Sequence, residues 1–202
     1  GSKVERKEDK KFLTGKGRYT ADINFTHQTY AFFVRSPHAR AKIHKVDISK
    51  ASKAPGVVKI FTGDDIAREK IGGLIAGWKI VSQDGKDMKC PPHPVLAKDS
   101  VNFVGDHVAV VVAETLEQAK NAAELVNINY KVQKAVIKTE DATSFEAIHE
   151  GIDNNLSFDF LLGDKGKTDE AFSKADKIIK VDLINNRLVP NAMEPRACVV
   201  DY

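Results

Sequence analysis

The chain has 202 residues, with 42% hydrophobic and 29% charged side chains, enough for one large domain or two small ones around a buried core. The formal net charge of +3 comes from 31 Lys and Arg against 28 Asp and Glu, and this balance argues against a nucleic-acid partner. No apolar run is long enough to span a membrane. The two cysteines, Cys90 and Cys198, predict neither a disulfide framework nor a paired metal motif, which favours a reducing, cytoplasmic compartment.

The polar start of the chain, residues 1–16, is predicted to form an N-terminal arm. Gly1 and Ser2 are interpreted as the scar of a cleaved expression tag. Gly15 and Gly17 follow no strand and lack a third glycine, so they do not make a dinucleotide-binding fingerprint. A local turn is the better interpretation of this pair.

Three strands are predicted between residues 30 and 61. The apolar run at 30–34 is typical of a strand covered on both faces. A second strand spans residues 41–48, and its alternation slips between Ile43 and Val46, which predicts a bulge. The third strand, at 57–61, follows a short helical turn at 49–54. Asp64 and Asp65 are interpreted as the start of another helical turn, which explains this acid pair better than shared proton chemistry.

Residues 71–94 are predicted to form a long irregular excursion, because they hold several glycines and end in a proline-rich run. Long structured loops are often functional. Cys90 and His93 have the spacing of two metal ligands, but a structural zinc site needs two more that have no obvious source. Trp78 is a candidate contact for a ligand or partner, although a single aromatic residue is usually packing.

A strand–helix–strand module is predicted next, over residues 108–132. Six consecutive apolar residues at 108–113 indicate a buried strand. Thr115 and Gln118 form a capping box, after which Ala119, Ala122 and Ala123 recur on one helical face. Residues 126–132 return as a strand. This alternation predicts an α+β fold.

The remainder is predicted to contain a linker and the beginning of a second domain. A capping box at 143–146 predicts a short helix to about residue 150, and the polar stretch 151–155 predicts a domain boundary. Strands are predicted at 157–162, 178–184 and 196–202, and a helix at 168–175. The chain is therefore divided into 1–16, 17–135, 136–155 and 156–202.

No complete active site emerges from these residues. A phosphate-binding loop and a Gly-x-Ser-x-Gly nucleophile motif are both missing from the sequence. The histidines, at positions 27, 38, 44, 93, 107 and 149, form no His-x-x-x-His pair. We therefore predict no catalytic, cofactor-binding or metal-binding residue in this chain.

Several stretches follow one another in an order that matches a known family. They are RKEDKKFLTGKGRYTADI (6–23), FVRSPHARAKI (33–43), PGVVKIFTGDD (55–65), PVLA (94–97), VGDHVAVVVAET (104–115), QAKNAAELVNINY (118–130) and LVPNAMEPR (188–196). Together they resemble the large subunit of the molybdenum hydroxylases, the family of xanthine dehydrogenase, aldehyde oxidase and aerobic carbon monoxide dehydrogenase. The forms RSPHA and MEPR resemble the carbon monoxide dehydrogenase-type large chain more than animal xanthine oxidases.

The resemblance implies an α/β hammerhead domain at 17–135 and, at 156–202, the truncated start of the molybdopterin-binding domain. It implies that the complete enzyme is a hydroxylase or dehydrogenase that oxidises carbon monoxide, an aldehyde or a heterocycle with water-derived oxygen. A molybdenum–pterin cofactor would serve it, with iron–sulfur clusters on a small partner subunit and FAD on a medium one. The family's catalytic and cofactor motifs lie beyond the equivalent of Tyr202, so this fragment is expected to be inactive. Residues 193–196 are expected to fix the domain junction by ion pairing.

Two alternatives remain beside an excised enzyme fragment. One is a stand-alone module that docks onto other subunits. The other is a small-ligand binder that uses the 71–94 excursion and Trp78.

Overall fold

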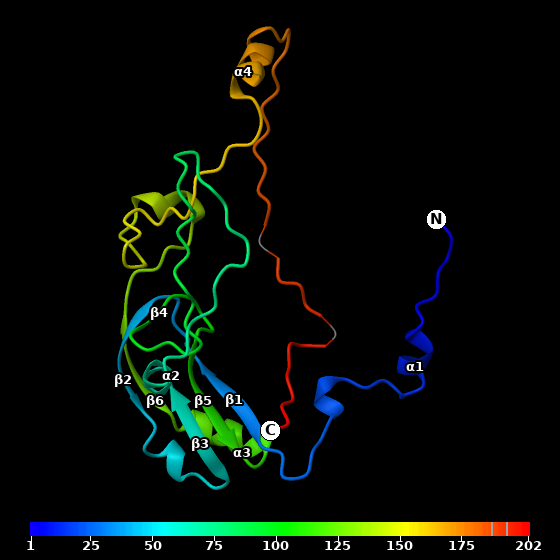
Figure 1. The fold of residues 1–202 in the computed structure, drawn as a ribbon, viewed down its shortest axis with the longest axis vertical. Coiled ribbons are helices and arrows are strands. Elements are labelled where there is room, and N and C mark those ends of the chain that lie inside the picture. Colours follow the sequence, from blue (N-terminus) through cyan, green and yellow to red (C-terminus); the bar gives the residue numbers. More distant parts are fainter. Residues whose placement is uncertain (187, 193) are drawn as a thin grey trace. The chain divides into compact units, whose positions relative to one another are not determined.

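The computed structural model describes residues 1–186, 188–192 and 194–202. The chain divides into two compact units, one of residues 29–165 and one of residues 1–28 together with 166–202. The 29–165 unit holds two three-stranded antiparallel sheets (Figure 1). This mixture of sheets and helices is the α+β fold that the sequence predicts.

The first sheet places β5 (His107–Ala113) between β1 (Tyr30–Arg35) and β3 (Val57–Thr62). Helix α3 (Leu116–Glu124) follows β5 and packs on one face of the sheet. The Thr115 hydroxyl accepts a hydrogen bond from the Gln118 N–H at 3.2 Å, which confirms the predicted helix start. Ala119 and Ala122 are fully buried because their small side chains let the helix lie close to the strands.

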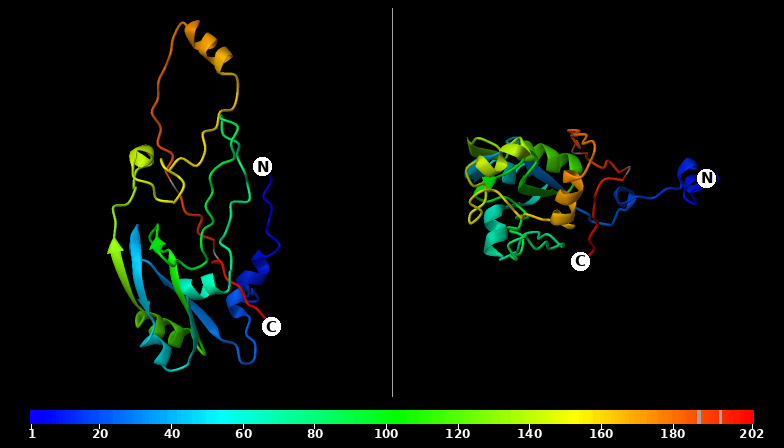
Figure 2. Two further views of the ribbon diagram at one scale, coloured as in Figure 1. Left: turned by 60° about the vertical axis from the view of Figure 1, so that its left-hand side comes forward. Right: turned by 90° about the horizontal axis from the view of Figure 1, so that it is seen from above.

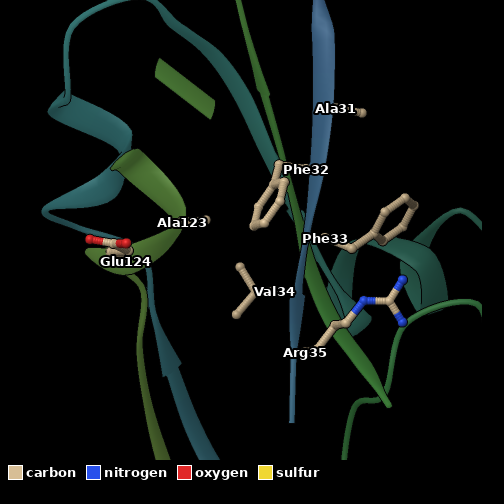
Figure 3. A pocket seen from close by; sticks show the side chains of 7 residues that line it. All are labelled: Ala31, Phe32, Phe33, Val34, Arg35, Ala123 and Glu124. Atoms are coloured by element: carbon tan, nitrogen blue, oxygen red, sulfur yellow. The ribbon is translucent and has the colours of Figure 1, made fainter. Parts of the chain in front are cut away.

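Strand β1 is covered on one face only, which corrects the prediction of a strand buried on both. Phe32 and Val34 point toward the C-terminal end of α3, whereas Phe33 and Arg35 point to the opposite side (Figure 3). Phe33 remains 37% exposed. The reason is that α3 covers one face of the sheet, and strand periodicity sends every second side chain to the other face.

The second sheet is built around β2 (Ala41–Asp47), flanked by β4 (Ser100–Val101) and β6 (Asn127–Val132). Its pairing with β6 shifts register between Ile43 and Lys45, which confirms the predicted bulge. The strand–helix–strand module is also confirmed as β5, α3 and β6, but its two strands belong to different sheets. Helix α3 therefore connects the sheets instead of crossing over within one.

The excursion at 71–94 leaves the sheets after α2 (Gly63–Arg68) and returns before β4, running out and back as a long loop (Figures 1 and 2). It is irregular, as predicted, with isolated bridges between Leu74 and His93 and between Val81 and Asp87. Residues 157–162 form no strand, contrary to the prediction. Instead this segment hydrogen-bonds to the excursion, where the Lys89 N–H donates to the Ser157 carbonyl at 2.8 Å.

The helix predicted at 143–150 is also wrong. A 3₁₀ segment, η3 (Thr139–Ser144), ends where that helix was expected to begin. The Asn155 side chain donates to the carbonyl oxygens of Ala142 and Glu146, both at 3.0 Å. A side chain that binds these carbonyls competes with the helical hydrogen bonds they would otherwise accept.

The unit of residues 1–28 and 166–202 contains α1 (Asp9–Leu13), η1 (Thr20–Asp22) and most of α4 (Lys165–Ser173). Helix α1 lies where an irregular arm was predicted, and α4 confirms the later helix with its bounds shifted. The strands predicted at 178–184 and 196–202 are wrong, because these described residues form no ladder and are mostly exposed. An apolar run becomes a strand only when another strand supplies its hydrogen bonds.

The MEPR stretch is held differently from the ion pairing expected of it. Met193 lies outside the described residues. The Glu194 carboxylate accepts hydrogen bonds from the Thr20 N–H at 2.8 Å and from the Thr20 hydroxyl at 3.0 Å. Within the described part of the chain, these neutral donors take the place of an ion-pair partner for Glu194.

Candidate functional site

The 29–165 unit contains a cleft of about 770 Å³. Three segments line it: the end of the excursion, residues 98–106, which include the short strand β4 (Ser100–Val101), and residues 136–157. A second, smaller hollow of about 400 Å³ lies between β1 and the end of α3 and has mostly apolar walls (Figure 3). The first cleft is the candidate site, because polar side chains converge there.

Asp106 is the buried charge of this cleft. Its side chain is 3% exposed, and its Oδ2 accepts a hydrogen bond from the Asn102 N–H at 3.1 Å. Its Oδ1 is buried and has no hydrogen-bond partner among the residues that the structure describes. The nearest ion-pair partner is His93, whose Nε2 lies 3.6 Å from Oδ1, too far for a hydrogen bond. A buried carboxylate with one free oxygen favours a cationic donor beside it.

The backbone around Asp106 is fixed by the turn after β1. The Ser36 N–H donates to the Asp106 carbonyl at 2.8 Å, and the Gly105 N–H donates to the Ser36 carbonyl at 2.8 Å. Gly105 has a φ of 95°, a conformation that glycine adopts without a steric cost. Residues 35–39 (RSPHA) and 104–106 (VGD) are therefore neighbours in space, and this contact holds the Asp106 side chain inward.

Two ionisable side chains beside Asp106 have shifted pKa values. Burial lowers the pKa of His107 below its usual range, and the Arg35 guanidinium lowers it further, so His107 is neutral at pH 7. Burial raises the pKa of the Tyr130 phenol, opposed in part by the Ser36 hydroxyl. Both side chains therefore remain uncharged at neutral pH.

The outer wall of the cleft is tied to β2 by Arg40, which is 8% exposed. Its Nη1 donates to Glu146 Oε1 at 2.7 Å and to the Lys134 carbonyl at 3.2 Å. Its Nη2 donates to the Ala147 carbonyl at 3.2 Å. Because two of these acceptors are backbone atoms, Arg40 fixes the course of the chain as well as pairing a charge.

The residues that the sequence singled out separate into two groups. Cys90 and His93 both line the cleft, but no group of three His, Cys, Asp or Glu side chains suited to a metal occurs among the described residues. Trp78 is 81% exposed and does not line the cleft. Asp65 caps α2, as predicted: its Oδ2 accepts from the Thr62 N–H at 2.8 Å, a contact that lowers the pKa of its carboxyl.

Sequence reasoning missed Asp106, although a signal was present. A Gly-Asp pair directly before a largely buried strand places an acid at the edge of the core. The alternation of apolar residues does not reveal whether such an acid faces solvent or the interior.

The two sheets joined by α3 define the class of this protein as an α/β hammerhead domain. Residues 14–134, more than half of the chain, match the family described as aldehyde oxidase and xanthine dehydrogenase, a/b hammerhead domain. The chain belongs to this family, whose members include the molybdenum hydroxylases.

Its relatives are considerably longer proteins. The nicotine 6-hydroxylase large subunit of Paenarthrobacter nicotinovorans is 34% identical over 209 residues, which cover 100% of this chain and 24% of that protein. The carbon monoxide dehydrogenase large chain of Afipia carboxidovorans is 31% identical over 215 residues, with coverages of 98% and 25%. The solved CO dehydrogenase of Oligotropha carboxidovorans has a TM-score of 0.70 at 29% identity, covering 88% of this chain and 22% of that one. The chain thus spans about a quarter of the length of these curated relatives.

A helix long and apolar enough to cross a membrane does not occur in the described parts of the chain.

Proposed function

We propose that this chain is the N-terminal, non-catalytic portion of the molybdenum-cofactor-bearing large subunit of a hydroxylase or dehydrogenase. The single observation that carries the proposal is the hammerhead match at residues 14–134 within a chain that spans 24% of a relative named as a large subunit. The complete enzyme would oxidise a small carbon substrate, such as carbon monoxide, an aldehyde or a heterocycle, with oxygen derived from water.

The residues that line the 770 Å³ cleft do not fit the molybdenum–pterin cofactor. A pterin phosphate needs cationic side chains or converging backbone N–H groups. The main cleft instead presents the buried Asp106 carboxylate, which would repel an anionic group. We therefore infer that residues of the large subunit outside this chain hold the cofactor.

Electron transfer is assigned to partner subunits for a similar reason. An iron–sulfur cluster is usually held by four cysteine thiolates. This chain has two cysteines, Cys90 and Cys198, which are both exposed and are not paired with each other. Iron–sulfur clusters on a small subunit and FAD on a medium subunit complete the proposal, and a relative named as a dehydrogenase complex subunit supports such an assembly. Two free thiols also support a reducing, cytoplasmic location.

The role of the chain in such an enzyme is that of a scaffold. We propose that residues 17–135 form the hammerhead domain, that 136–155 link it, and that 156–202 begin the molybdopterin-binding domain. The apolar side chains at 178–184 support this division. Ile179 is 76% exposed and Ile184 is 90% exposed, as expected for a segment that packs against the remainder of the large subunit.

Molybdenum content tests the proposal. The 202-residue chain and a version extended through the downstream region, co-expressed with the partner subunits, would be purified and analysed for metal. We expect molybdenum and hydroxylase activity only in the preparation that contains the extended chain, and neither in the preparation of the 202-residue chain. Stoichiometric molybdenum in the short chain would refute the proposal. A stop codon after codon 202 in the gene would favour the stand-alone docking module instead.

A further inference from the structure

We propose that the 770 Å³ cleft binds a planar organic cation, of the amidinium or protonated N-heterocycle class, with the Asp106 carboxylate as its counter-ion. This site lies wholly within residues 29–165 and does not depend on the molybdenum chemistry proposed above. The ligand would therefore be bound by the 29–165 unit itself.

The charges around the cleft favour a cation. Lys89 and Asp99 also line it, but both are exposed, so water and salt screen them. The Lys98 ammonium lies 3.2 Å from the Asp64 carboxylate, which already offsets its charge. Among the described charged residues that line the cleft, Asp106 alone is almost fully buried. A desolvated charge attracts an opposite charge far more strongly than a solvent-screened charge does.

The geometry favours a flat donor. Asp106 Oδ2 is occupied by the Asn102 N–H, whereas Oδ1 has no hydrogen bond from the described residues. The His93 imidazole lies next to Oδ1, and its ring centroid is 5.4 Å from that of Phe103. A flat cation could take the place of this ring, contact Phe103 and donate an N–H to Oδ1 at hydrogen-bond distance, which His93 does not reach.

His93 can make room without disturbing the fold. Its side chain is 42% exposed, so the ring can swing outward into solvent. Its backbone stays anchored, because the Leu74 N–H donates to the His93 carbonyl at 2.7 Å and the His93 N–H donates to the Leu74 carbonyl at 2.8 Å. Displacement of the ring therefore requires side-chain rotation alone.

The walls suit an apolar body behind the charged head. Pro94, Phe103, Ile148 and Ile152 line the cleft together with Asp106. Small-ligand sites generally have volumes of about 300–1,000 Å³, mostly apolar walls and a few polar groups that set orientation. The cleft has this combination, so an aromatic amidine is the simplest probe.

Benzamidine and its neutral isostere benzamide test the site in the 202-residue chain. Each would be titrated while the backbone amide NMR signals of Asn102 and Phe103 are followed. We expect saturable shifts with benzamidine and at least about tenfold weaker binding of benzamide, since a charged partner of a buried carboxylate contributes at least that factor. Equal binding of the two probes, or no saturable shift up to about 10 mM benzamidine, would overturn the proposal.

Substitutions in the cleft test which residue binds the cation. Asp106→Asn should weaken benzamidine binding about tenfold or more, whereas Asp99→Asn removes the same charge from the exposed lining and should change it less than about twofold. His93→Ala should bind at least as tightly as the unmodified chain, because the imidazole no longer competes for Oδ1. A tenfold loss in His93→Ala, or none in a folded Asp106→Asn, would refute the assignment. If Asp106→Asn fails to fold, the comparison of benzamidine with benzamide decides.

Discussion

Asn155 is the residue whose substitution best tests how the outer wall of the cleft is held. Its Oδ1 accepts a hydrogen bond from the Ile148 N–H at 2.8 Å. Its Nδ2 donates to the carbonyl oxygens of Ala142, Phe145 and Glu146 at 3.0, 3.3 and 3.0 Å. Its φ is 55°, in the left-handed region that Asn adopts more readily than Ala. The substitution is Asn155→Ala, with Asn155→Gly as the matched control.

The magnitude follows from these contacts. The two N–H groups of the amide are shared by three carbonyls and count as about two hydrogen bonds, and Oδ1 adds a third. At about 1 kcal/mol each, the side chain contributes about 3 kcal/mol to holding the wall closed. The left-handed backbone costs Ala about 1–2 kcal/mol more. Gly avoids this backbone cost but gains conformational entropy when the wall opens. Asn155→Gly should therefore destabilise the closed wall less than Asn155→Ala, by roughly 0.5–1 kcal/mol.

Amide hydrogen exchange at Ile148 is the direct assay, because this N–H is bound by Asn155 itself. Each 1.4 kcal/mol changes the exchange rate about tenfold, so Asn155→Ala should speed exchange at Ile148 by at least about a hundredfold. Exchange in β5 should change little. A rate at Ile148 within about threefold of the unmodified chain would refute the role of Asn155. A milder effect for Ala than for Gly would show that the left-handed backbone is not required.

Three further predictions concern the stability of the sheet and helices between residues 57 and 124. Val111→Ala removes two carbons from a fully buried side chain and should lower the free energy of unfolding by about 2–3 kcal/mol, measured by urea denaturation. Thr115→Ala should lower it by about 1 kcal/mol by removing the cap of α3, whereas Thr115→Ser should retain most of it. The Thr62 N–H holds the pKa of Asp65 below its ordinary value, so the stability from this contact is present at neutral pH and is lost as acid protonates the carboxyl. Asp65→Asn should therefore show a flatter loss of stability below about pH 4, and identical pH profiles would contradict the assignment.

Local sequence patterns predicted the elements whose hydrogen bonds and burial arise close by in the chain. Helix α3 is an example, because Thr115 caps it and three alanines recur on one face. The bulge between Ile43 and Lys45 was visible as a slip in alternation. Helix α2 was marked by its acidic first turn. The ordered stretches over nearly the whole chain identified the family.

The same patterns failed where a segment depends on partners distant in sequence. Residues 178–184 have the composition of a strand but pair with no described segment. Residues 157–162 were expected to be a strand and instead bond to the excursion. The capping box at 143–146 predicted a helix that does not form, and the Asn155 side chain instead binds the carbonyl oxygens of Ala142 and Glu146. Composition shows which segments could form strands or helices, whereas the hydrogen-bonding partners decide whether they do.

By itself, the sequence of this protein determined that residues 108–132 form a strand, a helix and a strand, and that the chain belongs with the large subunits of molybdenum hydroxylases. Only the tertiary structure decided that β5 and β6 lie in different sheets and that Asp106 is buried beside His93. The reason is physical. Periodicity and caps act within about one turn of helix or one strand, but the burial of a charge depends on which distant segments close over it.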